Sequence, residues 1–385
     1  MSARHALYRP RPPRWCIFSP GRRSLDVLCG DTTDSGGAEA QVAYLARSLA
    51  DRGHEVALLY GDTRNRDPEQ VIAGVRCIDV MPAWRRPASL APFWRTLERL
   101  APDVMYARLP NDFLGLLGLF ARRRRGSQFI YALANDHHCR PSQAYDYNWW
   151  FHTPLYALGL MSANRITIQH AGQLDLASPR LRDRMIHVPN LIRSVRETPR
   201  SFQETTHDGI WVARIRPVKQ LGRFLDLAES LQSLRFAVIG GWDPTLPGTQ
   251  RRSLEQRMRS LPNLDFFGSR NADEVIGLIG RSKILVNTSD FEGFPNTMLE
   301  AWSVGVPVVS LRVDPGGIIG RERLGCVSRS LERLRSDVGQ LATSQALNRS
   351  CGEKGLAYVR RQHSLDVVHK ALLNGLSINA ASTLS

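Results

Sequence analysis

Lysine is scarce in this chain of 385 residues, because only four of its 51 basic residues are lysines and the other 47 are arginines. Genomic base composition alone can produce such a bias, so the excess of arginine identifies no site. Acidic residues are too few to balance it, and the formal net charge is +15 at pH 7. A cationic surface of this kind favours anionic partners, namely nucleotide sugars, acidic lipids or nucleic acid.

Cysteine pairs with the spacing of metal ligands or redox motifs are missing as well. The six cysteines are scattered and none forms a C-x-x-C pair, which argues against a zinc site or a thioredoxin-like motif. Unpaired thiols are typical of packed side chains in the reducing cytoplasm. We therefore expect a cytoplasmic protein that needs no metal and no cofactor.

Long apolar runs are also absent, since none reaches the ~20 residues that span a bilayer. Residues 1–23 are rich in arginine and proline and lack the apolar core of a secretory signal, so we predict a basic, mobile tail. Two apolar segments, 113–120 before the arginines at 122–125 and a second at 149–161, fit core helices of the first domain. They also fit a peripheral contact with the anionic inner face of a membrane.

Predicted strands and helices alternate along the chain, which is typical of α/β domains built on parallel sheets. The length suggests two domains. Hydrophobic content of 43% and charged content of 23% are ordinary for a globular protein. The polar stretch 194–208 marks the junction. We predict a first domain at 24–195, a second at 196–355 and a final segment, 356–385, with a helix at 356–376.

Short apolar stretches mark the candidate strands. In the first half they lie at 25–30, 55–60, 103–107, 129–133, 165–169 and 185–188. In the second half they lie at 209–213, 236–241, 264–268, 284–287 and 307–311. The apolar patch 15–18, inside the predicted tail, is a second candidate for the first strand.

The most informative motif places Glu292 and Glu300 eight positions apart around a predicted helix start. Pro295 suits the first turn of a helix, and Asn296 or Thr297 suits the cap. Carboxylates accept hydrogen bonds from sugar hydroxyls, and the N–H groups at the start of a helix bind phosphate. The pattern therefore fits a nucleotide sugar. For Glu300 alone, an ordinary carboxylate favoured by the helix dipole fits equally well.

A second motif, 212–220, places Arg214 and Lys219 between a predicted strand and a predicted helix. A guanidinium fork and a mobile ammonium suit the oxygens of a diphosphate. A solvated basic loop is the alternative in a chain with so many arginines.

Two weaker signals lie in the first half. Gly36 and Gly37 allow close approach of the backbone before a predicted helix, although they do not form a G-x-G-x-x-G motif. His137 and His138 follow the predicted strand 129–133, where a polar side chain can meet a substrate. An ordinary turn and satisfied loop histidines are the alternatives.

With these motifs the chain resembles the retaining glycosyltransferases of family 4, which have the GT-B fold: two Rossmann-like α/β domains whose parallel sheets face a central cleft. The resemblance covers about 25–376. Its most specific part is the E-x7-E motif, here Glu292 and Glu300 in the run E-G-F-P-N-T-M-L-E-A. Arg214 and Lys219 match the basic pair that meets the donor diphosphate.

The resemblance also implies roles for the two halves. The first domain is expected to bind the acceptor, the second to bind the donor, and the helix at 356–376 to return to the first domain. Glu300 would bind the donor ribose, while Glu292 and either His137 or His138 would face the donor sugar as catalytic groups. The remaining donor-binding residues would be Gly36, Gly37, Gly293, Phe294, Pro295, Asn296 and Thr297.

The function implied is transfer of a sugar from a nucleoside diphosphate sugar to a hydroxyl of a glycan or lipid-linked acceptor, with retention at the anomeric carbon, in polysaccharide or glycoconjugate biosynthesis. A nucleotide-sugar epimerase or phosphorylase of the same fold is the alternative. A nucleic-acid-binding protein is disfavoured, because the chain has no recognised module and no basic stripe interleaved with aromatic residues.

Overall fold

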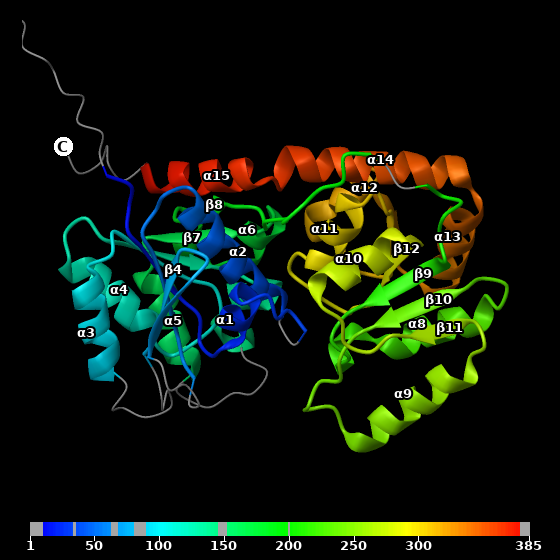
Figure 1. The fold of residues 1–385 in the computed structure, drawn as a ribbon, viewed down its shortest axis with the longest axis horizontal. Coiled ribbons are helices and arrows are strands. Elements are labelled where there is room, and N and C mark those ends of the chain that lie inside the picture. The colour runs from blue at the N-terminus through cyan, green and yellow to red at the C-terminus, as the bar shows by residue number, and fades with distance from the viewer. Residues whose placement is uncertain are drawn as a thin grey trace, which may run out of the picture.

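The computed structural model describes residues 11–33, 36–62, 68–80, 90–144, 152–198 and 201–377. They form two α/β domains that stand side by side, each around its own sheet (Figure 1). The predicted fold class, two α/β domains with parallel sheets, is confirmed. Residues 1–10 of the predicted N-terminal tail and residues 378–385 of the final segment lie outside the described residues. So do Trp149, Trp150 and Phe151 of the apolar segment 149–161.

The first domain has an eight-stranded sheet with the order β3-β4-β2-β1-β5-β6-β7-β8. Neighbouring strands are parallel except at the edge, where β3 and β4 pair antiparallel. The strands are β1 (Trp15–Phe18), β2 (Val56–Tyr60), β3 (Glu69–Ile72), β4 (Val75–Asp79), β5 (Val104–Ala107), β6 (Gln128–Ala132), β7 (Arg165–Ile168) and β8 (Met185–His187).

The first strand corrects two predictions. Trp15–Phe18, the second candidate, is a fully buried strand that pairs with β2 on one side and β5 on the other. The favoured candidate at 25–30 is wrong, because its apolar residues lie in helix α1 (Arg23–Leu28). A short apolar run fits a buried strand or a buried helix equally well. The predicted tail is likewise wrong for the residues of β1.

The second domain has a six-stranded parallel sheet with the order β11-β10-β9-β12-β13-β14. The strands are β9 (His207–Val212), β10 (Phe236–Ile239), β11 (Leu264–Phe266), β12 (Ser282–Asn287), β13 (Val308–Ser310) and β14 (Gly325–Val327). The first five confirm predicted strands, while β14 was not predicted.

In each sheet the chain adds strands first toward one edge and then toward the other. The order of strands changes direction between β1 and β5 in the first domain and between β9 and β12 in the second. In open parallel sheets, ligands bind beyond the carboxyl ends of the strands at such a reversal. The residues that follow these four strands are therefore the natural components of a site.

Helices cover both faces of each sheet (Figure 1). Besides α1, the first domain has α2 (Gly37–Asp51), α3 (Leu90–Leu100), α4 (Leu114–Arg123), α5 (His152–Ser162), α6 (Gly172–Leu176) and α7 (Pro179–Arg182). The second has α8 (Leu221–Ser230), α9 (Gly248–Ser260), α10 (Ala272–Gly280), α11 (Asn296–Ser303), α12 (Ile318–Arg321) and α13 (Leu331–Thr343).

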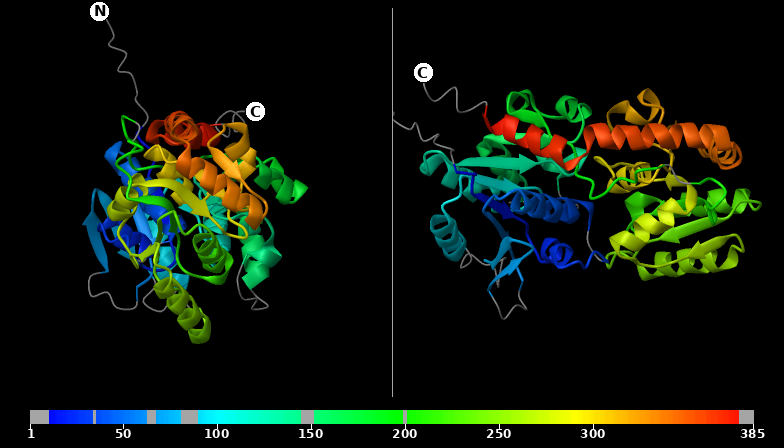
Figure 2. Two further views of the ribbon diagram at one scale, coloured as in Figure 1. Left: turned by 90° about the vertical axis from the view of Figure 1, so that its right-hand side faces the viewer. Right: turned by 45° about the horizontal axis from the view of Figure 1, so that its top comes forward.

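The predicted helix at 356–376 is two helices, α14 (Gln345–Gln362) and α15 (Leu365–Ser377), which run along both domains (Figure 2). The break falls at His363, whose buried ring binds the carbonyl oxygen of Asn190 through Nδ1 at 2.8 Å. α15 packs Val368 and Leu372 into the core of the first domain. The chain thus returns to the first domain as expected, with a bend that the apolar pattern did not indicate.

Helix α14 positions α11 through a close backbone contact, and replacing Gly352 by alanine tests it. A Cβ at Gly352 would lie 2.2 Å from the carbonyl oxygen of Gly305, which follows α11. Backbone cannot move aside as a flexible side chain can, so we expect Gly352→Ala to lower the free energy of unfolding by about 1–3 kcal/mol. Urea unfolding of the purified protein measures the change.

Gly339→Ala on α13 is the matched control, because a Cβ there meets open space within 4 Å. Alanine is the better helix former, so this variant should gain up to about 1 kcal/mol. A loss of stability in both variants, or in neither, would contradict the role given to the contact with Gly305.

Candidate active site

The segment 288–296 carries the chain from the carboxyl end of β12 into α11. α11 begins at Asn296 as predicted, with Pro295 at the N-cap position. The prediction that Asn296 or Thr297 caps the helix is wrong, because no side chain makes a capping hydrogen bond there. Asn296 instead reaches the first domain, where its Nδ2 donates to the carbonyl oxygen of Gly37 at 2.9 Å.

Lys219 and Glu292 form a half-buried ion pair, in which Lys219 Nζ donates to Glu292 Oε1. Ser289 Oγ donates to the same oxygen at 2.8 Å. Lys219 follows β9 and Glu292 follows β12, and these strands are neighbours at the point where the second sheet reverses. Arg214, which also follows β9, is half-buried. The structure thus brings the basic motif and the first glutamate of the E-x7-E motif together.

Glu300 lies on α11 as an isolated carboxylate, with no hydrogen bond to its side chain within the described ranges. Burial raises its pKa to about 7, and the charge of Arg193 opposes the rise. Because the fold disfavours the ionised form, the ligand-free protein loses stability as the pH rises from about 4.5 to about 7. A ligand that donates hydrogen bonds to this carboxylate would offset that cost.

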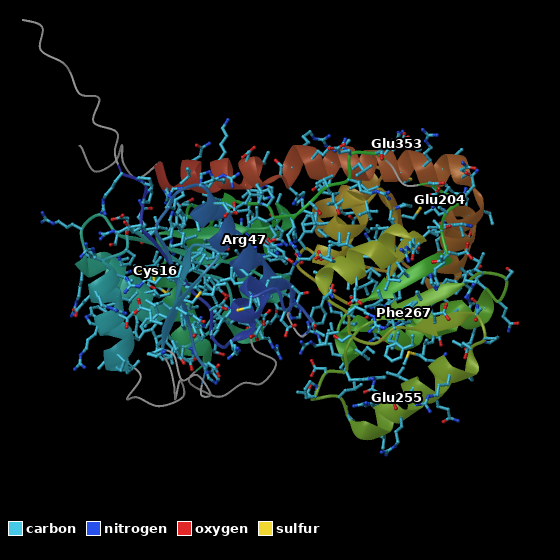
Figure 3. All side chains as sticks on the ribbon, viewed as in Figure 1. Cys16, Arg47, Glu204, Glu255, Phe267 and Glu353 are labelled. Atoms are coloured by element: carbon cyan, nitrogen blue, oxygen red, sulfur yellow. The ribbon has the colours of Figure 1, made fainter. Side chains whose placement is uncertain are left out.

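A cavity of about 370 Å³ lies between the domains. Tyr44 and Arg47 on α2 line it from the first domain, and the start of α10, including Asp273, lines it from the second. Figure 3 shows Arg47 on the side of α2 toward the second domain. The guanidinium of Arg193 lies 5.7 Å from the centroid of the Tyr44 ring and pairs with Asp273 at 3.3 Å.

The charge of Glu300 reaches this cavity. Burial raises the pKa of the Tyr44 hydroxyl, and the negative charge of Glu300 raises it further. The cavity is therefore linked to Glu300 electrostatically through Tyr44 and Arg193, which both line it.

Gly37 and Gly293 allow the backbones of the two domains to approach closely. A Cβ at Gly37, which follows Gly36 at the start of α2, would lie 3.0 Å from Asn296 Nδ2. A Cβ at Gly293 would lie 2.3 Å from Gln169 Oε1, 2.9 Å from Asn135 Cα and 3.0 Å from the carbonyl oxygen of Ala134. No larger residue fits at 293 while the domains touch.

The histidines separate into two environments. His137 stacks on Phe291 of the second domain, with ring centroids 4.0 Å apart and an angle of 21° between the rings. His138 Nδ1 accepts the N–H of Ala134 at 3.4 Å. Burial, together with the charge of Arg108, lowers the pKa of His138 to about 3. His138 is therefore neutral, with Nε2–H as its free donor.

Three contributors to the cleft escaped the sequence motifs. Gln169 Oε1 accepts the N–H of Phe294 at 3.2 Å. Asn190 Nδ2 donates to the carbonyl oxygen of Phe294 at 3.2 Å and to Asn296 Oδ1 at 3.0 Å. Arg108 Nη2 donates to Asn190 Oδ1 at 2.6 Å. Arg108 and Asn190 follow predicted strands and Gln169 ends one, and that position at the end of a strand was the signal that could have found them.

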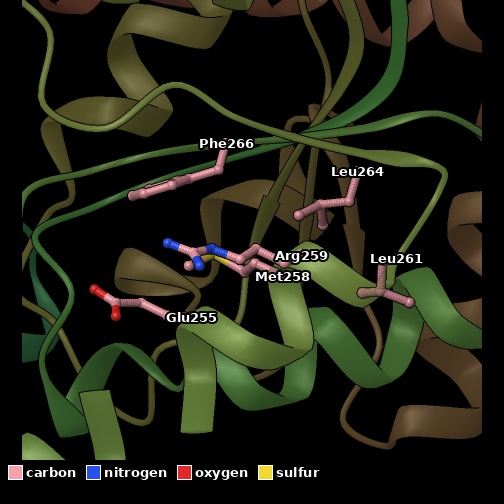
Figure 4. A pocket seen from close by; sticks show the side chains of 6 residues that line it. All are labelled: Glu255, Met258, Arg259, Leu261, Leu264 and Phe266. Atoms are coloured by element: carbon pink, nitrogen blue, oxygen red, sulfur yellow. The ribbon is translucent and has the colours of Figure 1, made fainter. Parts of the chain in front are cut away.

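A second cavity, of about 270 Å³, lies apart from this region between α9 and β11 (Figure 4). Glu255 and Arg259 on α9 and Phe266 on β11 line it, together with apolar side chains. None of the predicted site residues contributes to it, so it is no part of the candidate site.

Two family models match successive parts of the chain: the glycosyl transferase 4-like domain at residues 36–190 and the glycosyl transferases group 1 domain at residues 206–343. No curated protein matches the chain significantly. The matched segments correspond to the two domains of the structure.

Solved structures share the whole fold. Sucrose-phosphate synthase from Thermosynechococcus elongatus is 15% identical, with a TM-score of 0.75 over 97% of this chain and 100% of that chain. HepE from Anabaena, in complex with UDP-glucose, is 13% identical, with a TM-score of 0.68 over 95% and 99%. WaaG, a glycosyltransferase involved in lipopolysaccharide biosynthesis, is 16% identical, with a TM-score of 0.64 over 94% and 98%.

These similarities define the architecture as GT-B. Together with the two family models, which cover both domains, they show that the chain is a glycosyltransferase of the GT-B type.

Replacing Gly293 by alanine tests the contact between the domains. Because a Cβ at 293 collides with Gln169 and with backbone at 134–135, we expect Gly293→Ala to fold but to keep the domains apart. Small-angle X-ray scattering should then give a larger radius of gyration than for the wild type. Gly277→Ala on α10, where a Cβ meets open space, is the control. Identical scattering from both variants would contradict the contact.

Proposed function

We propose that this glycosyltransferase moves a hexosyl group from a nucleoside diphosphate sugar to a hydroxyl of a glycan or lipid-linked acceptor, with retention at the anomeric carbon. The observation that carries the proposal is the Lys219–Glu292 ion pair at the carboxyl edge of the second sheet, next to the start of α11. It places a cation and a carboxylate at the edge of the sheet from which the chain enters α11.

The donor diphosphate is assigned to the start of α11. The N–H groups there, with Lys219 and Arg214, would stabilise the charge that grows on the departing diphosphate, which is the main electrostatic task of the reaction. In the ligand-free structure the N–H of Phe294 is bound by Gln169. Donor binding would therefore compete with one contact between the domains.

The nucleoside is assigned to Glu300 and to the 370 Å³ cavity lined by Tyr44 and Arg193, the two residues that interact electrostatically with Glu300. Two ribose hydroxyls would donate to the Glu300 carboxylate and lower its pKa from about 7. Binding near neutral pH should accordingly release a proton. This assignment gives the buried carboxylate the partners that the described chain does not supply.

Retention follows from attack on the face that the leaving group vacates. The bond between the anomeric carbon and the diphosphate oxygen breaks, the acceptor oxygen bonds to the same face, and its proton passes to the departing diphosphate. Glu292 and either His137 or His138 are assigned to the donor sugar. As a neutral imidazole, His138 would donate a hydrogen bond through Nε2 and would not supply a charge.

The comparisons support the substrate classes. HepE is described in complex with UDP-glucose, WaaG as acting in lipopolysaccharide biosynthesis, and TarM in complex with UDP and α-GlcNAc-glycerol. By analogy we assign this chain to polysaccharide or glycoconjugate biosynthesis. An epimerase or phosphorylase is not favoured, because both matching family models describe transferases.

Turnover with a panel of nucleotide sugars tests the proposal. With the donor that the wild type uses, Glu300→Ala and Lys219→Ala should each lower kcat/KM by about tenfold to a hundredfold, because each removes hydrogen bonds to a charged group. Wild-type rates in both variants would show that the site is wrong. Product analysis without acceptor separates an epimerase from a transferase.

The pH dependence of the same assay identifies Glu300. Protonation below pH 7 weakens its carboxylate as an acceptor, so the KM of the wild type for the donor should rise as the pH falls through about 7. Glu300→Gln cannot titrate and should bind the donor weakly without this rise. The same rise in Glu300→Gln would assign the titration to another group.

We also propose that the first domain lies on an anionic membrane surface through α4 and α5. No helix in the described ranges is long and apolar enough to cross a membrane. The inner faces of α4 and α5 belong to the core, but Leu119, Leu158 and Met161 are 41%, 54% and 58% exposed. Leu158 packs over Gly115, one turn from Leu119, and the arginines at 122–125 are exposed beside them. Exposed apolar side chains beside cations fit a bilayer interface.

Vesicle co-sedimentation tests this surface. Vesicles with phosphatidylglycerol should capture the wild type at low salt and release it at high salt, while Leu158→Ser/Met161→Ser should be captured several-fold less. Val71→Ser is the control, because Val71 on β3 is 71% exposed elsewhere on the same domain. Equal capture of the three proteins, or no capture at low salt, would contradict the proposal.

A further inference from the structure

Arg108 stands directly after β5, at the point where the first sheet reverses its direction of connection. Lys219 and Glu292 occupy the corresponding edge of the second sheet. His138, Gln169 and Asn190 follow β6, β7 and β8, so they share the carboxyl edge with Arg108. The first domain therefore places a cation in the same kind of crevice in which the second domain places its ion pair.

The guanidinium of Arg108 is buried without a counter-charge. The residue is 6% exposed. Its Nη2 donates to Asn190 Oδ1 at 2.6 Å and its Nη1 to the Tyr106 hydroxyl at 3.5 Å, while its buried Nε has no partner. Within the described residues, no carboxylate forms an ion pair with it.

Among the described residues, the two carboxylates that are buried about as deeply as Arg108 are paired. Asp62 is 8% exposed and binds Arg22 at 2.6 Å, and Asp337 is 5% exposed and binds Arg333 at 3.1 Å. A buried charge without an opposite charge is costly, because it loses its hydration. Arg108 lacks the opposite charge that these two carboxylates have.

The neighbours of Arg108 offer hydrogen-bond donors. The nearby His138 is neutral and keeps its Nε2–H free, since its Nδ1 accepts from Ala134. Asn190 accepts a hydrogen bond from Arg108. Its own Nδ2 donates to the carbonyl oxygen of Phe294 and to Asn296 Oδ1 near the start of α11. A guanidinium and a neutral imidazole that both donate fit a phosphoryl or carboxylate group.

We infer that Arg108 binds an anionic group of a substrate, a phosphoryl or carboxylate group, from the first-domain side of the cleft. The inference rests on the proposed transfer reaction, which brings such groups to this cleft. The group belongs either to the donor diphosphate or to an acidic acceptor. In both cases it neutralises the buried guanidinium when the substrate binds.

Arg108→Met in the full chain tests the inference, because methionine keeps much of the volume and removes the charge. Asn190 Oδ1 keeps a second donor, Gln169 Nε2 at 3.1 Å. We therefore expect the ligand-free variant to melt at or above the wild-type temperature, while its affinity for the anion falls roughly tenfold to a hundredfold. Arg95→Met, which removes an exposed arginine of α3, is the control and should behave as the wild type.

Calorimetric titrations separate the two sources. UDP, GDP and ADP probe the donor, and glycerol 3-phosphate and glucuronate probe an acidic acceptor. Weaker binding of the nucleoside diphosphates by Arg108→Met assigns the group to the donor, and weaker binding of the small acids alone assigns it to the acceptor. Arg108→Lys, which keeps the charge, should recover part of the affinity.

Wild-type affinity of Arg108→Met in both series overturns the inference, whatever its melting temperature. A lower melting temperature with unchanged affinities would show that Arg108 only supports Asn190. Sugar transfer plays no part in these titrations. Failure of the proposed reaction would appear in the turnover assay, and failure of this inference in the affinities.

Discussion

The contact between the start of α11 and the first domain is the constraint on which the rest of the site depends. Asn296 binds the carbonyl oxygen of Gly37, and the backbone of Phe294 binds Gln169 and Asn190. Gly293 leaves no room for a side chain against the opposite strand ends. The helix start to which we assign the donor diphosphate is therefore also a surface on which the domains meet, and under that proposal substrate binding would involve the same backbone groups as the contact between the domains.

Charge in the cleft is arranged for a ligand that the protein alone does not supply. Burial raises the pKa of Glu300 to about 7, which disfavours its ionised form. Arg108 is buried without a carboxylate partner among the described residues. Lys219 and Glu292 form an ion pair with one another. An anionic donor whose hydroxyls can donate hydrogen bonds would complement Arg108 and Glu300, because neither has a partner of opposite charge in the described chain.

Much of the architecture was predictable from local pattern, because a buried parallel strand is a short apolar run between polar turns. The errors have physical causes. The apolar run at 25–30 is short enough to form either a strand or a helix. It is mostly helical in the structure, where β1 already occupies the central position of the sheet. The closing helix bends where His363 binds Asn190. Asn296 does not cap α11 as expected, because its side-chain amide donates a hydrogen bond to the carbonyl oxygen of Gly37 in the first domain.

The sequence by itself determined the two-domain alternation and the motifs in which several informative residues stand close together, above all Glu292 with Glu300 and Arg214 with Lys219. Only the tertiary structure decided how Gln169, Asn190 and Arg108 join them. These residues are single polar side chains at the ends of separate strands, with no spacing that marks them. A parallel sheet gathers the carboxyl ends of distant segments at one edge, and closure of two such edges creates neighbours that no local pattern contains.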